Sequence, residues 1–212
     1  MNLYGTGGIA VVAAEVLAAN QIDISRFYDD DPSKTQYLDR PVSAGLELDP
    51  MLVLPEDEDC LICIGNNKRR SELIRLLSPM LGTAIHPSAM ISPSARIGAG
   101  TMIFHGSKVQ AQARVGKAVI VNTGGSIDHD CVIGDFAHIA PNVTLCGYVE
   151  VGEGANIGAA SVVIPGVKIG KWSTLGAGAV VVSDIPAYAV AVGCPARVIK
   201  QQSADYVRAV NG

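Results

Sequence analysis

The sequence predicts a small α/β domain over residues 1–84, followed by a parallel β-solenoid over residues 85–185. The solenoid is predicted because every sixth residue from Ile85 to Val181 is Ile, Leu or Val, at seventeen positions in succession. Neither the alternation of a strand nor the 3.6-residue period of a helix produces such a pattern, so it indicates a repeat of short strands. The α/β domain is predicted from three strand-like segments that end in glycine or polar residues, two of them followed by helical patterns.

A second set of positions supports the solenoid. The residues four places after each aliphatic are small or Val, from Ala89 to Ala179. Strands of one hexad each, turned by small residues, stack so that each coil buries its neighbours. Glycine directly follows the aliphatic at seven positions, where we expect tight turns that need a residue without Cβ strain: Gly98, Gly116, Gly134, Gly152, Gly158, Gly170 and Gly176.

The first strand end of the Rossmann-like domain suits a phosphate group. A short strand over residues 2–4 is followed by the loop Gly5, Thr6, Gly7 and Gly8, and then by a helix over residues 9–19. Such a turn offers backbone N–H groups and a helix N-terminus to an anion.

Two further strand ends carry polar residues. The second strand is predicted to end at Tyr28, and the following Asp29 and Asp30 lie where a ribose hydroxyl would bind, although a solvated acidic turn explains them equally well. A third, buried strand over residues 60–64 leads into Gly65, Asn66 and Asn67, and a helix extends from Lys68 through Arg70 to Leu77. The three ends together predict a site for a nucleotide diphosphate, in a domain that is short for NAD.

Composition excludes several other functions. The net charge is −4, with an acidic first domain and no basic stripe interleaved with aromatics, so nucleic acid is not expected as a partner. No uncharged apolar run approaches the roughly 20 residues of a membrane span. Five cysteines without a signal peptide indicate a reduced, cytoplasmic protein. Cys60 and Cys63 have redox spacing, but their apolar surroundings favour a core role.

The polar exceptions within the repeats predict a catalytic site. His129 follows the inward-facing Ile127 by two residues, so it should lie at a coil corner and face outward. The flanking Asp128 and Asp130 favour its imidazolium form, which suits a general base. The alternative is a solvated surface histidine. Gly147, eighteen residues later, should lie one coil above, with its N–H available to an oxyanion. Cys131, His86 and His105 are interpreted as structural.

His138 lies nine residues after His129, which corresponds to half a coil. The two histidines should therefore lie on opposite sides of one prism. They can converge on one substrate only if prisms pack side by side, which predicts a cyclic homotrimer.

Several motifs together resemble those of the sialic-acid O-acetyltransferase and sugar-nucleotide N-acetyltransferase family of hexapeptide-repeat acyltransferases. They are Gly5-Thr-Gly-Gly, Ile64-Gly-Asn-Asn, His86-Pro-Ser-Ala, Asn122-Thr-Gly, the block from Asp128 to His138, and Gly193-Cys-Pro-Ala-Arg197. The resemblance implies a left-handed parallel β-helix with three hexads per coil, hence nearly six coils. It also implies a homotrimer, with acetyl-CoA along the seam between neighbouring β-helices and a nucleotide-linked amino sugar on the N-terminal domain.

The resemblance assigns roles position by position. His129 is the base and Asp130 polarises it; Asn122 and His138 surround the thioester, and Gly147 donates to the carbonyl oxygen. The other assigned residues are Gly158, Ala159, Gly176 and Ala177 against the pantetheine, Gly5, Thr6, Gly7 and Gly8 at the phosphates, Asp29 and Asp30 at the uridine or sugar, and Asn66, Asn67 and Arg70 in the loop after the third strand. Relatives commonly carry His where this chain has Ile9.

The function predicted in this way is acetyl-CoA-dependent N-acetylation of the 4-amino group of a UDP-linked 4-amino-4,6-dideoxy sugar, as in bacillosamine synthesis. Transfer is direct, with His129 as base and no metal. One alternative is O-acetylation of sialic acid or another sugar hydroxyl. The other is a zinc-dependent hydratase on the same solenoid, which the spacing of His105, His129 and His138 disfavours because three imidazoles would have to converge. Residues 186–212 are expected to cap the β-helix.

Overall fold

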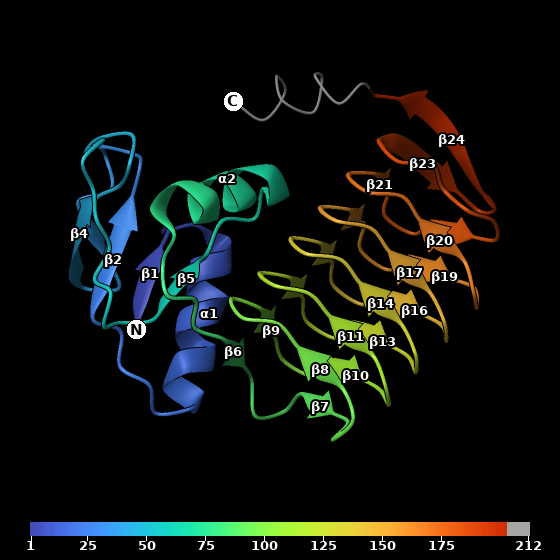
Figure 1. The fold of residues 1–212 in the computed structure, drawn as a ribbon, viewed down its shortest axis with the longest axis horizontal. Coiled ribbons are helices and arrows are strands. Elements are labelled where there is room, and N and C mark those ends of the chain that lie inside the picture. The colour runs from blue at the N-terminus through green and yellow to red at the C-terminus, as the bar shows by residue number, and fades with distance from the viewer. Residues whose placement is uncertain (203–212) are drawn as a thin grey trace.

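The structure is a computed structural model that describes residues 1–202, and it contains both predicted parts (Figure 1). The N-terminal part is a five-stranded sheet in the order β3-β4-β2-β1-β5, in which β3 alone runs antiparallel to its neighbour. Its strands are β1 (Asn2–Tyr4), β2 (Arg26–Asp29), β3 (Gln36–Tyr37), β4 (Arg40–Ala44) and β5 (Cys60–Ile62), and its helices are α1 (Gly8–Ala19) and α2 (Asn67–Leu77).

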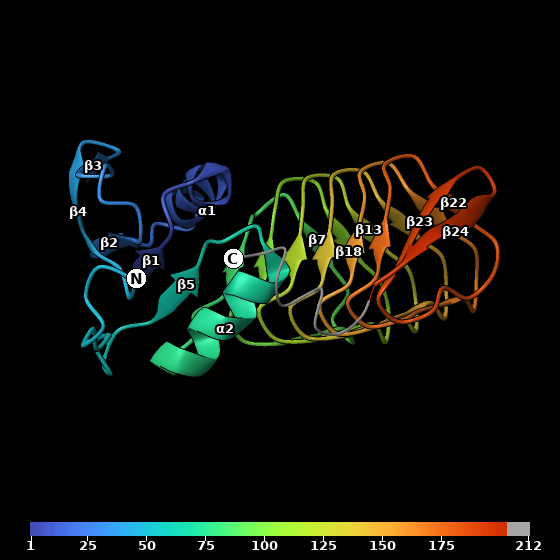
Figure 2. The same cartoon turned by 90° about the horizontal axis from the view of Figure 1, so that it is seen from above.

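The strands β1, β2 and β5 alternate between two small cores. Leu3, Phe27 and Leu61 pack with α1, whereas Tyr4, Tyr28 and Ile62 pack with Leu73 and Ile74 of α2. The two helices therefore lie on opposite faces of this sheet (Figure 2). Cys60 and Cys63 are both buried, and burial raises the pKa of the Cys60 thiol to about 12. Their predicted core role is confirmed.

The solenoid consists of seventeen two-residue strands, each paired in parallel with the strand eighteen residues away. Face 1 contains β7 (Met90–Ile91), β10 (Lys108–Val109), β13 (Ser126–Ile127), β16 (Thr144–Leu145), β19 (Val162–Val163) and β22 (Val180–Val181). Face 2 contains β8 (Arg96–Ile97), β11 (Arg114–Val115), β14 (Val132–Ile133), β17 (Glu150–Val151) and β20 (Lys168–Ile169). Face 3 contains β6 (Ala84–Ile85), β9 (Met102–Ile103), β12 (Ile120–Val121), β15 (His138–Ile139), β18 (Asn156–Ile157) and β21 (Thr174–Leu175).

The inside of the solenoid follows the two predicted sets of positions. From Ile103 to Val181 the hexad aliphatics are buried in one core, together with small residues such as Ala113, Cys131 and Ala155. The thiol of Cys131 donates to the carbonyl of Cys146 at 3.1 Å, and burial raises its pKa to about 11. Cys131 is thus part of the core, as predicted.

The predicted reason for the seven glycines is wrong. The left-handed backbone conformation falls three residues after each aliphatic, at every sixth position from Gly100 to Gly178, and eight of these fourteen residues are not glycine. The glycines that directly follow the aliphatics are needed because coils approach closely there. A Cβ on Gly134, for example, would lie 2.5 Å from the backbone nitrogen of Glu153 in the next coil.

Face 3 carries the N-terminal domain. Met102, Phe104 and Ile120 project from it and are fully buried against α1 and the strands of the N-terminal sheet. At the far end of the same face, β23 (Ala189–Gly193) pairs with β21, and β24 (Ala196–Gln201) pairs antiparallel with β23. Residues 203–212 of the predicted C-terminal segment lie outside the described residues. Within residues 1–202, no helix is long and apolar enough to cross a membrane.

Candidate functional site

His129 lies in the turn between β13 and β14, at the corner where face 1 meets face 2, with 48% of its side chain exposed. Asp130 follows in the left-handed conformation (φ 57°), which Asp tolerates better than most residues. This conformation places its Oδ2 2.9 Å from Nδ1 of His129. When Nδ1–H donates to this carboxylate, the lone pair of Nε2 is left free for a substrate proton. The backbone N–H of His129 donates to Asp128.

Gly147 lies directly above the imidazole of His129. A Cβ at Gly147 would lie 2.6 Å from Cε1 and 2.7 Å from Nε2 of His129, so the ring occupies the space of a side chain. Among the described residues, no acceptor binds the N–H of Gly147, whereas the next N–H, of Tyr148, donates to the carbonyl of His129. The ring of Tyr148 packs edge-on against the imidazole at 5.1 Å. A basic nitrogen and a free backbone donor therefore lie side by side.

His138 begins β15 on face 3, and Asn122 directly follows β12 on the same face. The amide nitrogen of Asn122 lies 3.2 Å from Nε2 of His138, and its amide oxygen accepts from the N–H of Thr123. Nε2 of His138 is therefore the acceptor. Burial, together with the charge of Arg70, lowers the pKa of His138 to about 4, so this imidazole is neutral at physiological pH.

The two histidines lie on opposite sides of the prism, because face 3 is opposite the corner that carries His129. This is the geometry that the hexad spacing predicts. The column of Asn122 continues through Ala140, Gly158 and Gly176, at one coil per step, with Ala159 and Ala177 directly after the two glycines. Gly158, Ala159, Gly176 and Ala177 are all at least partly exposed, and we call them the pantetheine band because the resemblance predicts the pantetheine there.

A cavity of about 610 Å³ lies between the N-terminal domain and face 3. We call it the nucleotide cavity, because it contains the glycine loop that the sequence predicts to bind the diphosphate. Its lining comprises Thr6, Gly7, Gly8, Ile9, Val12, Asp29, Lys34, Cys63, Ile64, Gly65, Phe104 and Asn122. At the start of α1, the N–H groups of Gly7, Gly8 and Ile9 have no acceptor among the described residues, and the space beside both glycines is open. The first turn of α1 can thus bind an anion. Because Asn122 also lines this cavity, it connects the anion site to His138.

The predicted acidic residues shape this cavity. Asp29 accepts from both the N–H and the hydroxyl of Thr6, at 2.7 and 2.6 Å, and so fixes the glycine loop. Asp30 lies further back, where it accepts from Tyr4 at 2.5 Å and from Arg69 at 2.7 Å. Burial alone would raise the pKa of Asp30, but these hydrogen bonds lower it overall. Gly5 forms the turn itself, with φ 100°.

The structure corrects the predicted roles of Asn67 and Arg70, neither of which lines the nucleotide cavity. Asn67 donates to the carbonyls of Gly154 and Ala155 in the solenoid. Arg70 is fully buried, and its guanidinium is bound by protein carbonyls, so it is not available to a nucleotide. Asn67 is half-buried and lines a different cavity. Asn66 accepts from the N–H of Arg69 as the N-cap of α2, and it lines a different, smaller cavity of about 200 Å³.

The sequence interpretation missed Lys34 and Phe104. Lys34 lines both the nucleotide cavity and an adjoining cavity of about 230 Å³, which also includes Asp29, Ser43 and Leu48. The only signal for Lys34 was its place in the loop after β2, near the predicted Asp29. Phe104 occupies a solenoid position two residues after the start of β9, and only the docking of the N-terminal domain shows that it faces a cavity.

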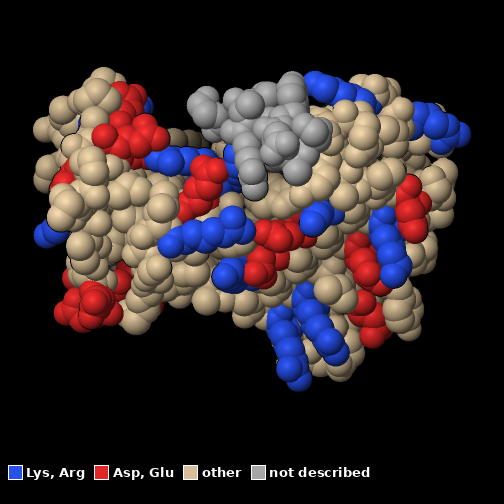
Figure 3. Space-filling model, turned by 45° about the horizontal axis from the view of Figure 1, so that its top comes forward, with Lys and Arg blue, Asp and Glu red and all other residues tan. Residues whose placement is uncertain are grey.

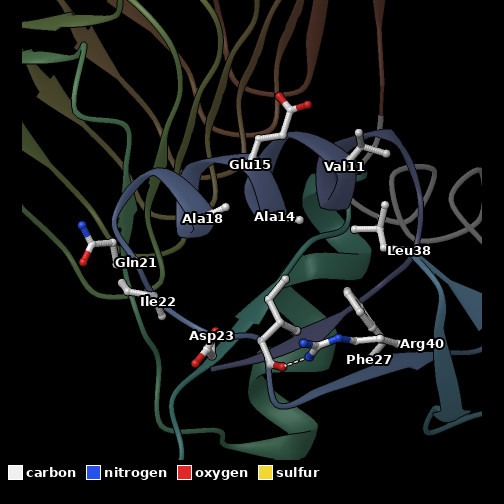
Figure 4. A pocket seen from close by; sticks show the side chains of 11 residues that line it. Val11, Ala14, Glu15, Ala18, Gln21, Ile22, Asp23, Phe27, Leu38 and Arg40 are labelled. Carbon is white, nitrogen blue, oxygen red and sulfur yellow. Dashed lines mark hydrogen bonds between the residues drawn. The ribbon is translucent and has the colours of Figure 1, made fainter.

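The surface has two further features, the second of which includes no predicted site residue. Acidic side chains gather on the N-terminal domain, whereas the solenoid carries lysines and arginines with acidic side chains between them (Figure 3). A groove of about 570 Å³ lies on another side of α1, between Val11, Phe27, Leu38 and Arg40 (Figure 4). Within residues 1–202, no group of three His, Cys, Asp or Glu side chains could hold a metal ion.

Comparison with known proteins assigns the family. The family model of the PglD N-terminal domain matches residues 1–77, and that of the bacterial transferase hexapeptide repeat matches residues 148–183. PerB from Caulobacter crescentus, solved in complex with CoA and GDP-perosamine, is 36% identical over 94% of this chain and 96% of its own, with a TM-score of 0.84. The chain belongs to the sugar-nucleotide N-acetyltransferases.

Two further members of the family have similar structures. The acetyltransferase domain of PglB from Neisseria gonorrhoeae is 34% identical over 93% of this chain and 98% of its own, with a TM-score of 0.85. WeeI from Acinetobacter baumannii AYE is 27% identical with the same coverage and a TM-score of 0.82. No curated protein sequence matches the chain. As a member of this family the protein is an acetyl-CoA-dependent N-acetyltransferase of nucleotide-linked amino sugars, and its solenoid is a left-handed parallel β-helix.

Proposed function

We propose that this N-acetyltransferase acts on the 4-amino group of a UDP-linked 4-amino-4,6-dideoxy sugar, with His129 as the general base. The observation that carries the proposal is the imidazole of His129, bound at Nδ1 by Asp130 and lying below the unpaired N–H of Gly147. A basic nitrogen beside a backbone donor is what direct acyl transfer to an amine requires.

The nucleotide cavity supports the proposed acceptor. The free N–H groups at the start of α1 and the ammonium of Lys34 would bind the diphosphate. Ile9, Val12 and Phe104 form an apolar wall that would cover the methyl group of a 6-deoxy sugar and would leave a 6-hydroxyl unpaired. The complex of PerB with GDP-perosamine supports a nucleotide-linked amino sugar. The choice of UDP rests on the resemblance to the enzymes of bacillosamine synthesis.

The proposed reaction is a direct transfer in two steps. The amine attacks the carbonyl carbon of acetyl-CoA while Nε2 of His129 takes a proton from the amine nitrogen, and the N–H of Gly147 donates to the oxyanion. The intermediate then collapses, the C–S bond breaks, and the CoA thiolate receives the proton from His129. Asn122 and His138 orient the thioester. A covalent acyl-enzyme is not invoked, because the Cys131 thiol is buried and its pKa is raised.

A substrate panel tests the proposal. UDP-, GDP- and CMP-linked 4-amino sugars, together with the matching 4-hydroxy sugars, are incubated with acetyl-CoA while free thiol is followed. We expect the UDP-linked amino sugar to be the best acceptor. His129→Ala should lose most of the turnover while staying folded, and His86→Ala, a histidine outside the site, should retain it. Near-normal turnover by His129→Ala, or a preference for a hydroxyl acceptor, would refute the proposal.

We also propose that the working form is a homotrimer. In one chain, His129 lies at the corner between faces 1 and 2, whereas Asn122, His138 and the pantetheine band lie along face 3. A cyclic trimer brings the corner of one prism to the seam of the next, which completes each site between two chains.

A further inference from the structure

Arg70 is the largest fully buried side chain among the described residues, and it carries a charge. Burying a guanidinium costs several kcal/mol unless its donors are satisfied. Here the acceptors are neutral, since no carboxylate among residues 1–202 lies within ion-pair distance of Arg70. Stability alone does not explain this arrangement, because an apolar side chain of similar volume would fill the same space without the desolvation free energy of a guanidinium.

One set of acceptors belongs to the solenoid. Nε of Arg70 donates to the carbonyl of Ala118 at 2.9 Å, and Nη2 donates to the carbonyl of Phe136 at 2.7 Å. Ala118 and Phe136 are stacked left-handed residues eighteen apart, and within the described residues the coil-to-coil ladder leaves their carbonyls without a backbone partner. The next residue of this column, Gly154, is bound in the same way by Asn67. The first turn of α2 thus binds three consecutive coils.

The other acceptors belong to the nucleotide cavity. Nη1 of Arg70 donates to the carbonyl of Ile64 at 2.7 Å and, more weakly, to that of Gly65 at 3.4 Å. Both residues line the nucleotide cavity. One planar side chain therefore joins the loop Ile64–Gly65, which we call the acceptor loop, to the coil of Phe136. His138 lies in the same coil, two residues after Phe136. The positive charge of Arg70 also contributes, after burial, to the lowered pKa of His138.

We propose that Arg70 is a positioning residue for acetyl transfer: it fixes the loop Ile64–Gly65 relative to the coil of Phe136 and His138, and so aligns the sugar amine with the thioester. This inference rests on the proposed function. The rigid fork of the guanidinium suits the role, because it presents donors in two directions at fixed angles, which a lysine ammonium does not.

The test compares Arg70→Lys with Arg75→Met. Arg75 lies on the same helix and also binds the solenoid, through Glu153 at 3.1 Å, but it does not contact the acceptor loop. For Arg70→Lys we expect kcat at saturating substrates to fall about 100-fold, since a misplacement of about 1 Å costs that much, with little change in the Kd of the sugar nucleotide. Arg75→Met should keep the wild-type kcat. A wild-type kcat in folded Arg70→Lys, or an equal loss in Arg75→Met, would overturn the proposal.

A second measurement uses the wild-type protein, so that it does not depend on folding of the variant. Hydrogen exchange is recorded with and without UDP, and in a second arm with GDP. A nucleotide bound at the glycine loop should slow exchange of the amides of Ala118 and Phe136 through Arg70, although it does not touch them. A bound nucleotide that protects only the loop overturns the positioning role. If neither nucleotide binds, the proposed function fails instead, which separates the two outcomes.

Discussion

At the residue scale, the pair of Gly147 and His129 shows how the repeat builds a site. The eighteen-residue coil places a glycine over the histidine, and the ring fills the space in which any other residue would carry its Cβ. The same glycine leaves its N–H unpaired beside Nε2. Geometry that elsewhere in the solenoid only serves stacking here brings a backbone donor next to the imidazole that we propose as the base.

We predict that Gly147→Ala lowers kcat about 100-fold, because the new methyl group must push the imidazole of His129 out of line. The free energy of unfolding should change by less than about 0.5 kcal/mol, because the half-exposed imidazole can move toward solvent and leave room for the methyl group at the buried Gly147. Steady-state kinetics and urea unfolding of the same preparation measure the two effects. An unchanged kcat would show that the position of the His129 ring does not limit transfer.

The residues that were predicted correctly and those that were not differ in one respect. The position of His129 follows from its place in the hexad and from eighteen-residue stacking, which are properties of the sequence itself. Arg70 and Asn67 start a helix after a polar loop, a context that is typical of solvent or ligand contact. Their hydrogen bonds to Ala118, Phe136 and Gly154 follow only from the docking of α2 on the solenoid, which local sequence does not encode.

At the element scale, the parallel ladder stacks equivalent side chains of successive coils. On face 2, Arg114 of β11 is directly paired with Arg96 of β8, and both are exposed without an acidic partner among the described residues. Further along the same face, Glu150 and Lys168 are paired and form an ion pair at 3.0 Å. The first pair repels and the second attracts.

We predict that Arg114→Glu stabilises the protein by about 0.5 to 1 kcal/mol, because it converts a repulsive cross-strand pair into an attractive one. The matched control is Lys168→Glu, which makes the opposite change beside Glu150 and should destabilise by a similar amount. Urea unfolding at low and high salt measures both, and about 1 M salt should reduce both effects. Destabilisation by Arg114→Glu would contradict the prediction.

The elements themselves were predictable to different extents. Strands that repeat every six residues could be placed from the sequence, as could α1 and α2, whose apolar patterns are regular. The strands β3 and β4 were missed because they are short, largely exposed and interrupted by Pro41, so they carry no alternating pattern. The sheet order, with β4 beside β2, is likewise a tertiary property.

At the scale of the whole molecule, the prism separates the two parts of the proposed active site. His129 lies at one corner, whereas Asn122 and the small residues of the pantetheine band lie along the opposite face. A rigid solenoid cannot fold these two parts onto each other. The N-terminal domain, packed on face 3, holds the nucleotide cavity next to the band and not next to the histidine of the same chain.

A subunit-mixing experiment tests this arrangement. His129→Ala chains lack the proposed base but keep Asn122 on face 3. Asn122→Ala chains keep the proposed base but lack this residue of the proposed acetyl-CoA site. A trimer of either type alone should therefore be nearly inactive. In trimers reassembled from an equal mixture, a site is complete when the base comes from one type of chain and the seam from the other, so about a quarter of the sites should work. Thiol release measures the recovery, and differently tagged chains confirm that mixed trimers form. Mixed trimers without recovered activity would place His129 and Asn122 in one chain's site, because only a site divided between chains can be restored by exchanging them.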